Sequence, residues 1–410
     1  MIPIAVFIVA LVFLLIIVRH IGKRKLPIWV IMTAGAVAAI IFQCISVQDA
    51  VFAINYEVIV FLFLMFIFGA ALDKSGILHS VSVSAFAKAK TKKRVLLIFI
   101  AVTALASAFL MNDTIAIIGT PIALFCAKKY NLPAKTMLLA LCFSVTFGSS
   151  VTPIGNPQNL LIAMSEGVPY AFPTFALYLL VPALISLAVV YFILSISVKD
   201  DVAAAEIETD VTDYKLAGLC KISFVIVIAM IIARIVLSVF SIELPFVLIA
   251  AAAAAPLLIF SRKRVELLKN VDYTTLLFFA SMFILMAAVW NSGFIQTLLP
   301  DSISTSVPVL LFTGVIVSQF VSNVPFVLMI LPVLETAGAA LPMYMAAVAG
   351  TTCAGTLTIL GAASTIIVIQ HAEKSGESLS FIQYFKTGAI VTVIASAVYC
   401  GWIMMIGMIF

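Results

Sequence analysis

The sequence predicts an all-α polytopic membrane protein built from two inverted repeats, each with a re-entrant hairpin and a broken helix. Three observations predict this fold class. The 410 residues are 64% apolar and 10% charged, with a mean hydropathy of +1.27, which leaves too little polar surface for a soluble protein. Apolar runs of about 17–26 residues recur, the length that a helix needs to cross about 30 Å of hydrocarbon. Polar residues interrupt these runs at corresponding places in both halves.

The apolar runs predict about ten spans. They lie at about 1–18, 27–47, 57–72, 134–163, 172–198, 217–242, 245–260, 273–290, 341–370 and 385–408. A basic cluster follows the first run and none precedes it, so we interpret this run as a retained span and not as a signal peptide.

Basic residues indicate the orientation of the spans. Lys and Arg lie in short loops on one side, and Arg234 is the only basic residue within a span on this topology. Because cytoplasmic loops carry the excess of Lys and Arg, the pattern predicts an inner-membrane protein with its N- and C-termini outside. The net charge of +5 is thus a topology signal, and we expect membrane lipid as a partner but no nucleic acid.

Two pairs of apolar segments are separated by only a few polar residues. The inner hairpin covers 95–127 with its tip at Asn112-Asp113-Thr114, and the outer hairpin covers 306–334 with its tip at Ser322-Asn323. Such short tips favour re-entrant hairpins, because irregular backbone at mid-depth is tolerated where protein or water surrounds it. Twelve conventional spans with very short turns are the alternative.

Two longer spans are broken by small polar residues. The first, 134–163, is interrupted from Gly148 to Asn159, and the second is 341–370. The acidic stretch 199–216 is interpreted as a cytoplasmic linker. It divides a first repeat, 1–198, from a second, 217–410.

The two halves resemble each other in sequence. Residues 64–77 match 281–294 at seven of fourteen positions without a gap. The breaks also align, with Thr152, Gly155 and Asn159 falling on Thr358, Gly361 and Thr365. An odd number of crossings separates the copies, which predicts an inverted repeat. Interrupted segments in two such halves point to a transport site.

The tips and breaks are expected to converge on one substrate or ion site. Half-helix N-termini favour anions, and loosened carbonyl groups favour cations. The first repeat offers Asn112, Asp113, Thr114, Ser149, Ser150, Thr152, Gly155, Asn156 and Asn159. The second repeat offers Ser322, Asn323, Thr356, Thr358, Gly361, Ser364 and Thr365. For any single serine or threonine, bonding within its own helix is the alternative.

Asp113 is the only acidic residue that this topology places deep in the membrane, and such residues are functional by default. It is a candidate to take a proton or to bind Na⁺ through its oxygens, so we expect any Na⁺ near Asn112, Asp113 and Asn323. A structural cap of the tip helix is the alternative. Arg234 is expected to snorkel or to pair within the scaffold.

Three segments, in this order, resemble the ion transporter superfamily. They are MNDTIAIIGTPIAL at 111–124, TPIGNPQNLLIA at 152–163 and SNVPFVLMILPVL at 322–334. They are similar to the citrate/arsenite-permease-like branch, which is related to the divalent anion/sodium symporters. The resemblance implies outer scaffold helices around a transport unit that moves as an elevator, often within a homodimer. It also implies that Asn112 and Asn323 are the tip asparagines that frame cation and substrate sites.

The tips differ from the Ser-Asn-Thr tips of dicarboxylate symporters, because they read Met111-Asn112-Asp113 and Ser322-Asn323-Val324. An added carboxylate repels a dianion. Asn-Asp is closer to arsenite permeases, whose substrate is neutral or weakly anionic.

We therefore expect an ion-coupled secondary carrier for a small anion or oxyanion, arsenite-like or carboxylate, with Na⁺ or H⁺ as the coupling ion. A sodium/proton antiporter of the same fold is the rival hypothesis, with Asp113 as its titrating group. The sequence shows no His/Cys/carboxylate constellation and no nucleotide motif, so we expect neither an enzyme nor a cofactor.

Overall fold

The computed structural model describes residues 3–18, 26–77, 80, 86, 89–199, 201, 213–240, 242–294, 297, 303 and 305–409, and these residues form helices without any β-strand. The first half contains α1 (Ile4–Val18), α2 (Ile28–Ile41), α3 (Val47–Ala53), α4 (Tyr56–Ser75), α6 (Lys92–Phe109), α7 (Asn112–Lys129), α8 (Ala134–Ser150), α9 (Pro157–Ala163), α10 (Ala171–Phe175), the π-helix η1 (Ala176–Leu180) and α11 (Val181–Ser195). The second half contains α12 (Tyr214–Val239), α13 (Phe246–Phe260), α14 (Arg264–Lys269), α15 (Tyr273–Asn291), α17 (Val307–Val321), α18 (Asn323–Thr336), α19 (Leu341–Leu357), α20 (Ala363–Lys374) and α21 (Phe381–Ile409).

Five stretches among the described residues are long and apolar enough to cross a membrane. They are α4, the continuous helix Ala171–Ser195, α12, α15 and α21. Other expected spans, such as α2, α8 and α13, are apolar but shorter. The number of spans therefore stays a prediction. The expected linker 199–216 lies largely outside the described residues.

Side-chain caps fix several helix starts. Asn55 accepts a hydrogen bond from the Val58 N–H at 3.1 Å and so begins α4, because free N–H groups at a helix start need an acceptor. Asp213 begins α12 in the same way through the Leu216 N–H, and it forms an ion pair with Lys263 at 2.9 Å. These two interactions lower the pKa of the Asp213 carboxyl group.

The hairpins are pairs of helices with very short links, but their tips differ from the expected ones. Only Leu110 and Met111 separate α6 from α7, and only Ser322, with a φ of 70°, separates α17 from α18. The expected first tip, Asn112 to Thr114, is instead the first turn of α7. Asn112 Oδ1 accepts the Asp113 N–H at 2.9 Å. A polar side chain can thus accept a hydrogen bond from a free N–H group at a helix start. The polar residues at 112–114 therefore indicate the start of a helix and not a loop.

The breaks are shorter than expected from the sequence. The first runs from Val151 to Asn156, between α8 and α9, and the second from Thr358 to Ala362, between α19 and α20. The stretch 172–198, expected as one plain span, contains the π-helix η1. Pro182 has no N–H to donate to the Tyr178 carbonyl group, so the regular α-helical hydrogen bonding is interrupted next to η1. The Leu177 carbonyl oxygen in η1 accepts a hydrogen bond from Trp402 Nε1 at 3.0 Å.

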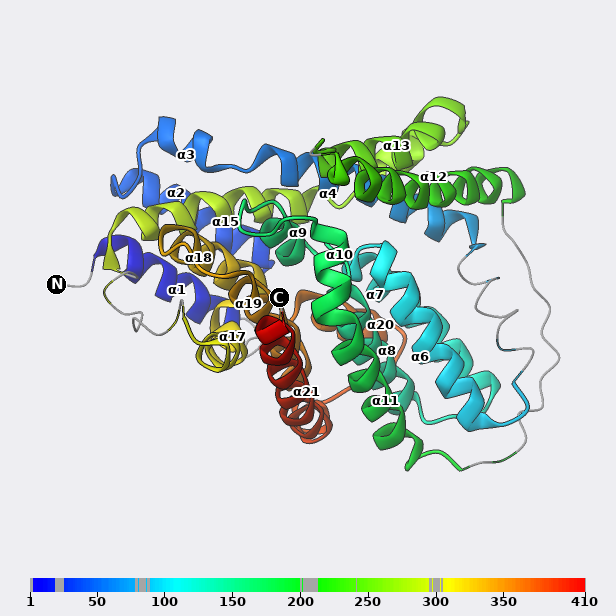
Figure 1. Ribbon diagram of the computed structural model, residues 1–410. Coiled ribbons are helices and arrows are strands. Elements are labelled where there is room, and N and C mark those ends of the chain that lie inside the picture. The colour runs from blue at the N-terminus through cyan, green and yellow to red at the C-terminus, as the bar shows by residue number, and fades with distance from the viewer. Residues whose placement is uncertain are drawn as a thin grey trace.

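Helices of the two halves are interleaved (Figure 1). α7 packs on α20, and α18 packs on α9. Thus the second arm of each hairpin contacts the half-helix that follows the break in the other half. Likewise α2 packs on α15, and α13 packs on α4. This interleaving brings the tips and breaks of both halves together.

Candidate functional site

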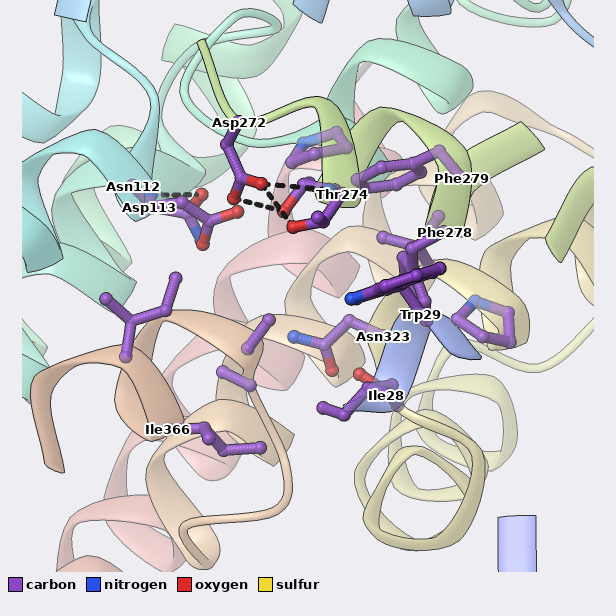
Figure 2. Close-up of a pocket in the computed structure, with 18 of the residues that line it drawn as sticks. Ile28, Trp29, Asn112, Asp113, Asp272, Thr274, Phe278, Phe279, Asn323 and Ile366 are labelled. Carbon is purple, nitrogen blue, oxygen red and sulfur yellow. Dashed lines mark hydrogen bonds between the residues drawn. The ribbon is translucent and has the colours of Figure 1, made fainter. Parts of the chain in front are cut away.

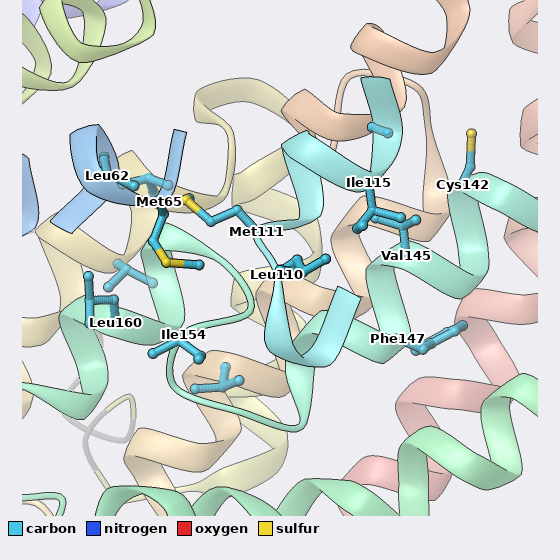
Figure 3. Packing of buried hydrophobic residues seen from close by; sticks show 14 of the residues in the cluster. Leu62, Met65, Leu110, Met111, Ile115, Cys142, Val145, Phe147, Ile154 and Leu160 are labelled. Carbon is cyan, nitrogen blue, oxygen red and sulfur yellow. The ribbon is translucent and has the colours of Figure 1, made fainter. Parts of the chain in front are cut away.

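The tip of the first hairpin is fixed by apolar packing. Leu110 and Met111 are 3% and 1% exposed, and they gather with Leu62 and Met65 of α4 (Figure 3). The backbone N–H of Asn112 donates to the Gly155 carbonyl oxygen at 2.9 Å. The hairpin tip is therefore tied to the first break, and the polar side chains of α7 begin at a defined position.

Asn159 organises the first break. Its Nδ2 donates to the carbonyl oxygens of Ser149, Ser150 and Thr152 at 3.1, 3.2 and 3.0 Å. These are carbonyl groups that a helix end leaves without partners. The Asn156 side chain caps α9 by accepting the Asn159 N–H at 2.8 Å. The expected site residues of the first break thus bond mainly to one another.

The second break is held by side chains from other helices. Thr358 Oγ1 donates to Gln319 Oε1 at 2.8 Å, and Gln319 Nε2 donates to the Ala354 carbonyl oxygen at 2.9 Å. The Tyr384 hydroxyl group donates to the Gly355 carbonyl oxygen at 2.7 Å and lies 3.4 Å from Thr365 Oγ1. Gln319 and Tyr384 were not among the expected site residues, since neither lies at a tip or a break.

The helix starts that follow both hairpin tips and both breaks border one cavity of about 380 Å³ (Figure 2). The cavity is lined by residues from the starts of six helices. They are Ile28 of α2, Asn112 and Asp113 of α7, Pro157 and Gln158 of α9, Thr274 and Thr275 of α15, Asn323 and Val324 of α18, and Ala363 of α20. The partial positive charges of six helix N-termini therefore converge on this space.

Most of these helix starts lack a side-chain cap. The residues before α2, α7, α18 and α20 accept no capping hydrogen bond through their side chains. Asn156 and Asp272, in contrast, cap α9 and α15. The starts of α2, α18 and α20 therefore present backbone N–H groups that can donate to a bound oxygen atom. At the start of α7, the Asn112 and Asp113 N–H groups already donate to the Gly155 carbonyl oxygen and to Asn112 Oδ1.

The charged groups of the cavity are two carboxylates. Asp113 and Asp272 line it, and the described lining residues include no Lys, Arg or His. Asp113 is 8% exposed, and its Oδ1 has no hydrogen-bond partner; the Oδ1 atom of Asn323, 5% exposed, also has none. Within the described part of the chain, no group of three or more His, Cys, Asp or Glu is placed to hold a metal ion.

The structure brings only some of the expected residues to the cavity. Asn112, Asp113, Ser322 and Asn323 line it, while Thr114 lines an adjoining cavity of about 210 Å³. The others lie beside the breaks and away from both cavities: Ser149, Ser150, Thr152, Gly155, Asn156, Asn159, Thr356, Thr358, Gly361, Ser364 and Thr365.

Asp272, Thr274 and Thr275 were missed by the sequence reasoning. Asp272 accepts the Thr275 N–H at 3.0 Å and the hydroxyl groups of Thr274 and Thr275 at 2.6 Å each. The pattern Asp-x-x-Thr before an apolar run is a helix-start signal. That signal predicts the start of α15, but it does not predict that this start faces the hairpin tips.

Arg234 lies at a second cavity, of about 300 Å³, which Glu57 and Glu243 also line. Its guanidinium carbon lies 3.7 Å from the centroid of the Phe246 ring. This geometry is a cation–π contact. Arg234 therefore packs within the helices α12 and α13, and it does not reach the cavity between the tips.

Interrupted helices that end around one cavity, within a chain rich in long apolar helices, define a multi-pass membrane transporter. Residues 11–350 match the citrate transporter family, CitMHS, and the chain belongs to this family. The earlier resemblance to the citrate/arsenite-permease-like branch is confirmed.

Several similar proteins are transporters. A silicon efflux transporter from Oryza sativa subsp. japonica is 28% identical, covering 89% of this chain and 90% of that protein. An uncharacterised transporter from Mycobacterium tuberculosis is 26% identical, covering 88% and 90%. The crystal structure of the YdaH transporter from Alcanivorax borkumensis has a TM-score of 0.55 at 13% identity, covering 98% of both chains. This last likeness concerns the fold alone.

Proposed function

We propose that the protein is an ion-coupled secondary active transporter that moves a small oxyanion, or the neutral oxyacid from which it forms, across the inner membrane. The observation that carries this proposal is the convergence, on one cavity of about 380 Å³, of the helix starts that follow both hairpin tips and both breaks. Such convergence near a repeat interface is typical of carriers. The silicon efflux relative supports a substrate of this class.

The charges of the cavity favour a neutral or singly charged substrate. Uncapped helix starts at Asn323 and Ala363 suit the oxygen atoms of an oxyacid. Asp113 and Asp272 oppose a dianion or trianion, because no basic side chain among the described lining residues offsets them. An arsenite-like or silicic acid-like molecule fits this balance better than free citrate, and a carboxylate would need accompanying cations.

The contacts between helices support an inverted repeat. The pair α7 and α20 corresponds to α18 and α9, and the pair α2 and α15 corresponds to α13 and α4. Matching contacts of this kind are expected when two halves are related by a pseudo-two-fold axis. We further propose that the hairpins and broken helices move as an elevator against the remaining helices, in a homodimer.

Transport by purified protein in proteoliposomes tests the proposal. Arsenite, silicic acid, succinate and citrate are offered under a Na⁺ gradient, a pH gradient or neither. We expect arsenite or silicic acid to accumulate only with a gradient. Asn323→Ala should abolish accumulation, whereas Thr336→Ala, at the far end of the same helix, should not. Accumulation of none of the four, or equal fluxes without a gradient, would contradict the proposal.

A sodium/proton antiporter is the second candidate, and the two carboxylates of the cavity favour it. Na⁺-driven proton movement in the absence of any oxyacid, followed with a pH-sensitive dye, would identify this activity. We expect Asp113→Asn to abolish exchange in an antiporter. An oxyacid carrier in which Asp113 is only a cap would keep its uptake in the same variant.

A further inference from the structure

Two cavities adjoin at a pair of carboxylates. The cavity between the tips and the neighbouring cavity of about 210 Å³ share Asp113, Asp272, Thr275 and Ile367 in their linings. Asp113 belongs to α7, the second arm of the first hairpin, whereas Asp272 and Thr275 belong to the start of α15. The boundary between the cavities is therefore formed by two elements far apart in the sequence.

Two carboxyl groups line this boundary, and neither forms a salt bridge among the described residues. Asp113 is 8% exposed, and its buried Oδ1 has no hydrogen-bond partner; in Figure 2 its carboxylate lies beside that of Asp272. Lys74 lines the neighbouring cavity, but its Nζ lies 2.6 Å from Glu266 Oε1. Asp73, the other charged residue of that cavity, is acidic.

The oxygen atoms at this boundary suit a bound cation. Asp272 is exposed at this boundary whereas Asp113 is buried, and like charges on the two carboxyl groups repel each other. A hard cation between them removes this repulsion and finds the oxygen ligands that it prefers. The hydroxyl group of Thr275, which donates to Asp272 Oδ2 at 2.6 Å, holds that carboxylate in place and is itself a further oxygen.

We propose that Asp113 and Asp272 together form a Na⁺ site that bridges the first hairpin and α15. This inference rests on the proposed function, in which the hairpin moves relative to helices such as α15. Na⁺ then binds tightly only while the hairpin lies next to α15. Occupancy of the site is thereby linked to the position of the transport unit, and Asp272 is a specificity residue contributed from outside the tips and breaks.

Na⁺ binding to the purified full-length protein tests this site without any substrate. Thermal unfolding is followed as NaCl replaces choline chloride at constant ionic strength, and ²²Na⁺ binding is measured directly. We expect saturable stabilisation by Na⁺. Asp272→Asn and Asp113→Asn should each weaken Na⁺ binding by at least the ~10- to 100-fold that loss of an outer-shell partner costs a metal site.

Matched variants distinguish the loss of a Na⁺ ligand from a general disturbance of the protein. Asparagine still caps a helix, so Asp272→Asn should keep α15 intact. Thr275→Val keeps both carboxylates and should weaken Na⁺ binding less. Asp73→Asn removes a carboxylate that lines only the neighbouring cavity, and it should leave the affinity for Na⁺ unchanged.

Unchanged Na⁺ affinity in Asp272→Asn, or equal stabilisation of the wild type by choline and Na⁺, would overturn the site. Oxyacid uptake without Asp272-dependent Na⁺ binding would refute this inference and leave the proposed function standing. Asp272-dependent Na⁺ binding in a protein that accumulates no oxyacid would refute the proposed function and leave the Na⁺ site standing.

Discussion

Gly155 is the residue at which the first break leaves least room. A Cβ atom there would overlap the Ser149 carbonyl oxygen, and the Gly155 carbonyl oxygen accepts the Asn112 N–H at 2.9 Å. Gly155→Ala must therefore displace the backbone that ties the break to the hairpin tip. We expect a loss of about 1–3 kcal/mol in stability, as for other overpacked sites, seen as a lower unfolding temperature together with loss of transport.

Gly218→Ala is the matched control, because nothing lies within 4 Å of a Cβ atom at that position in α12. There alanine should stabilise the helix slightly, since glycine costs helices about 0.5–1 kcal/mol relative to alanine. Equal unfolding temperatures of the two variants would show that the break can accommodate a methyl group.

Asn159 gives a second test at this scale. Its Nδ2 satisfies three carbonyl oxygens, and it is fully buried. Asn159→Ala should cost about 1–3 kcal/mol, because buried acceptors lose their donor. Asn159→Asp should cost more, because a carboxylate facing three carbonyl oxygens adds repulsion.

The unfolding temperatures of both variants are compared with that of Asn270→Asp. Asn270 is exposed and its Nδ2 donates to a single carbonyl oxygen, that of Glu266. We expect Asn159→Asp to lower the unfolding temperature most and Asn270→Asp least. The opposite order would show that Asn159 does not hold the break together.

At the scale of elements, the interruptions were predictable and their partners were not. Polar residues within apolar runs locate the tips and breaks to within a few residues, because lipid penalises such residues elsewhere. Gln319 and Tyr384 hold the second break from other helices, and Asp272 reaches the cavity from α15. Those contacts depend on how helices of the two halves pack together, and local sequence patterns do not encode that packing.

The contact between α4 and the first hairpin is likewise not encoded in local sequence patterns. A Cβ atom at Gly69 would lie 2.7 Å from Thr114 Cγ2 and 2.9 Å from Thr114 Oγ1. Gly69→Ala should therefore destabilise the protein by about 1–3 kcal/mol. Thr114→Ala removes both atoms, so the double variant should regain most of the lost stability, with a coupling of about 0.5–3 kcal/mol.

Unfolding temperatures of the two single variants and the double variant measure this coupling. Additive losses would mean that α4 and α7 do not touch as described.

For the whole molecule, the basic residues and the cavities together imply a direction. Lys74, Lys263 and Arg264 lie at the ends of α4 and α14, near Asp272 at the start of α15. On the topology expected from the positive-inside rule, this end faces the cytoplasm. The cavity between the tips borders this same end. The cavity at Arg234 is lined by Glu57, at the end of α4 opposite Lys74, and by Tyr170, which directly precedes α10. On that topology, the expected state of this structure is inward-facing.

Accessibility to a membrane-impermeant thiol reagent checks this orientation in sealed vesicles. Thr274→Cys, at the first cavity, should react in inside-out vesicles and be protected in right-side-out vesicles, because bulk water reaches it from the cytoplasm. Tyr170→Cys, at the second cavity, should show the opposite pattern. Both variants are made without Cys44 and Cys400, the two native cysteines that are not buried. Reaction of both positions from the same side would place the two cavities on one face of the membrane. That result would contradict the expected topology, which places these two helix starts on opposite sides of the membrane.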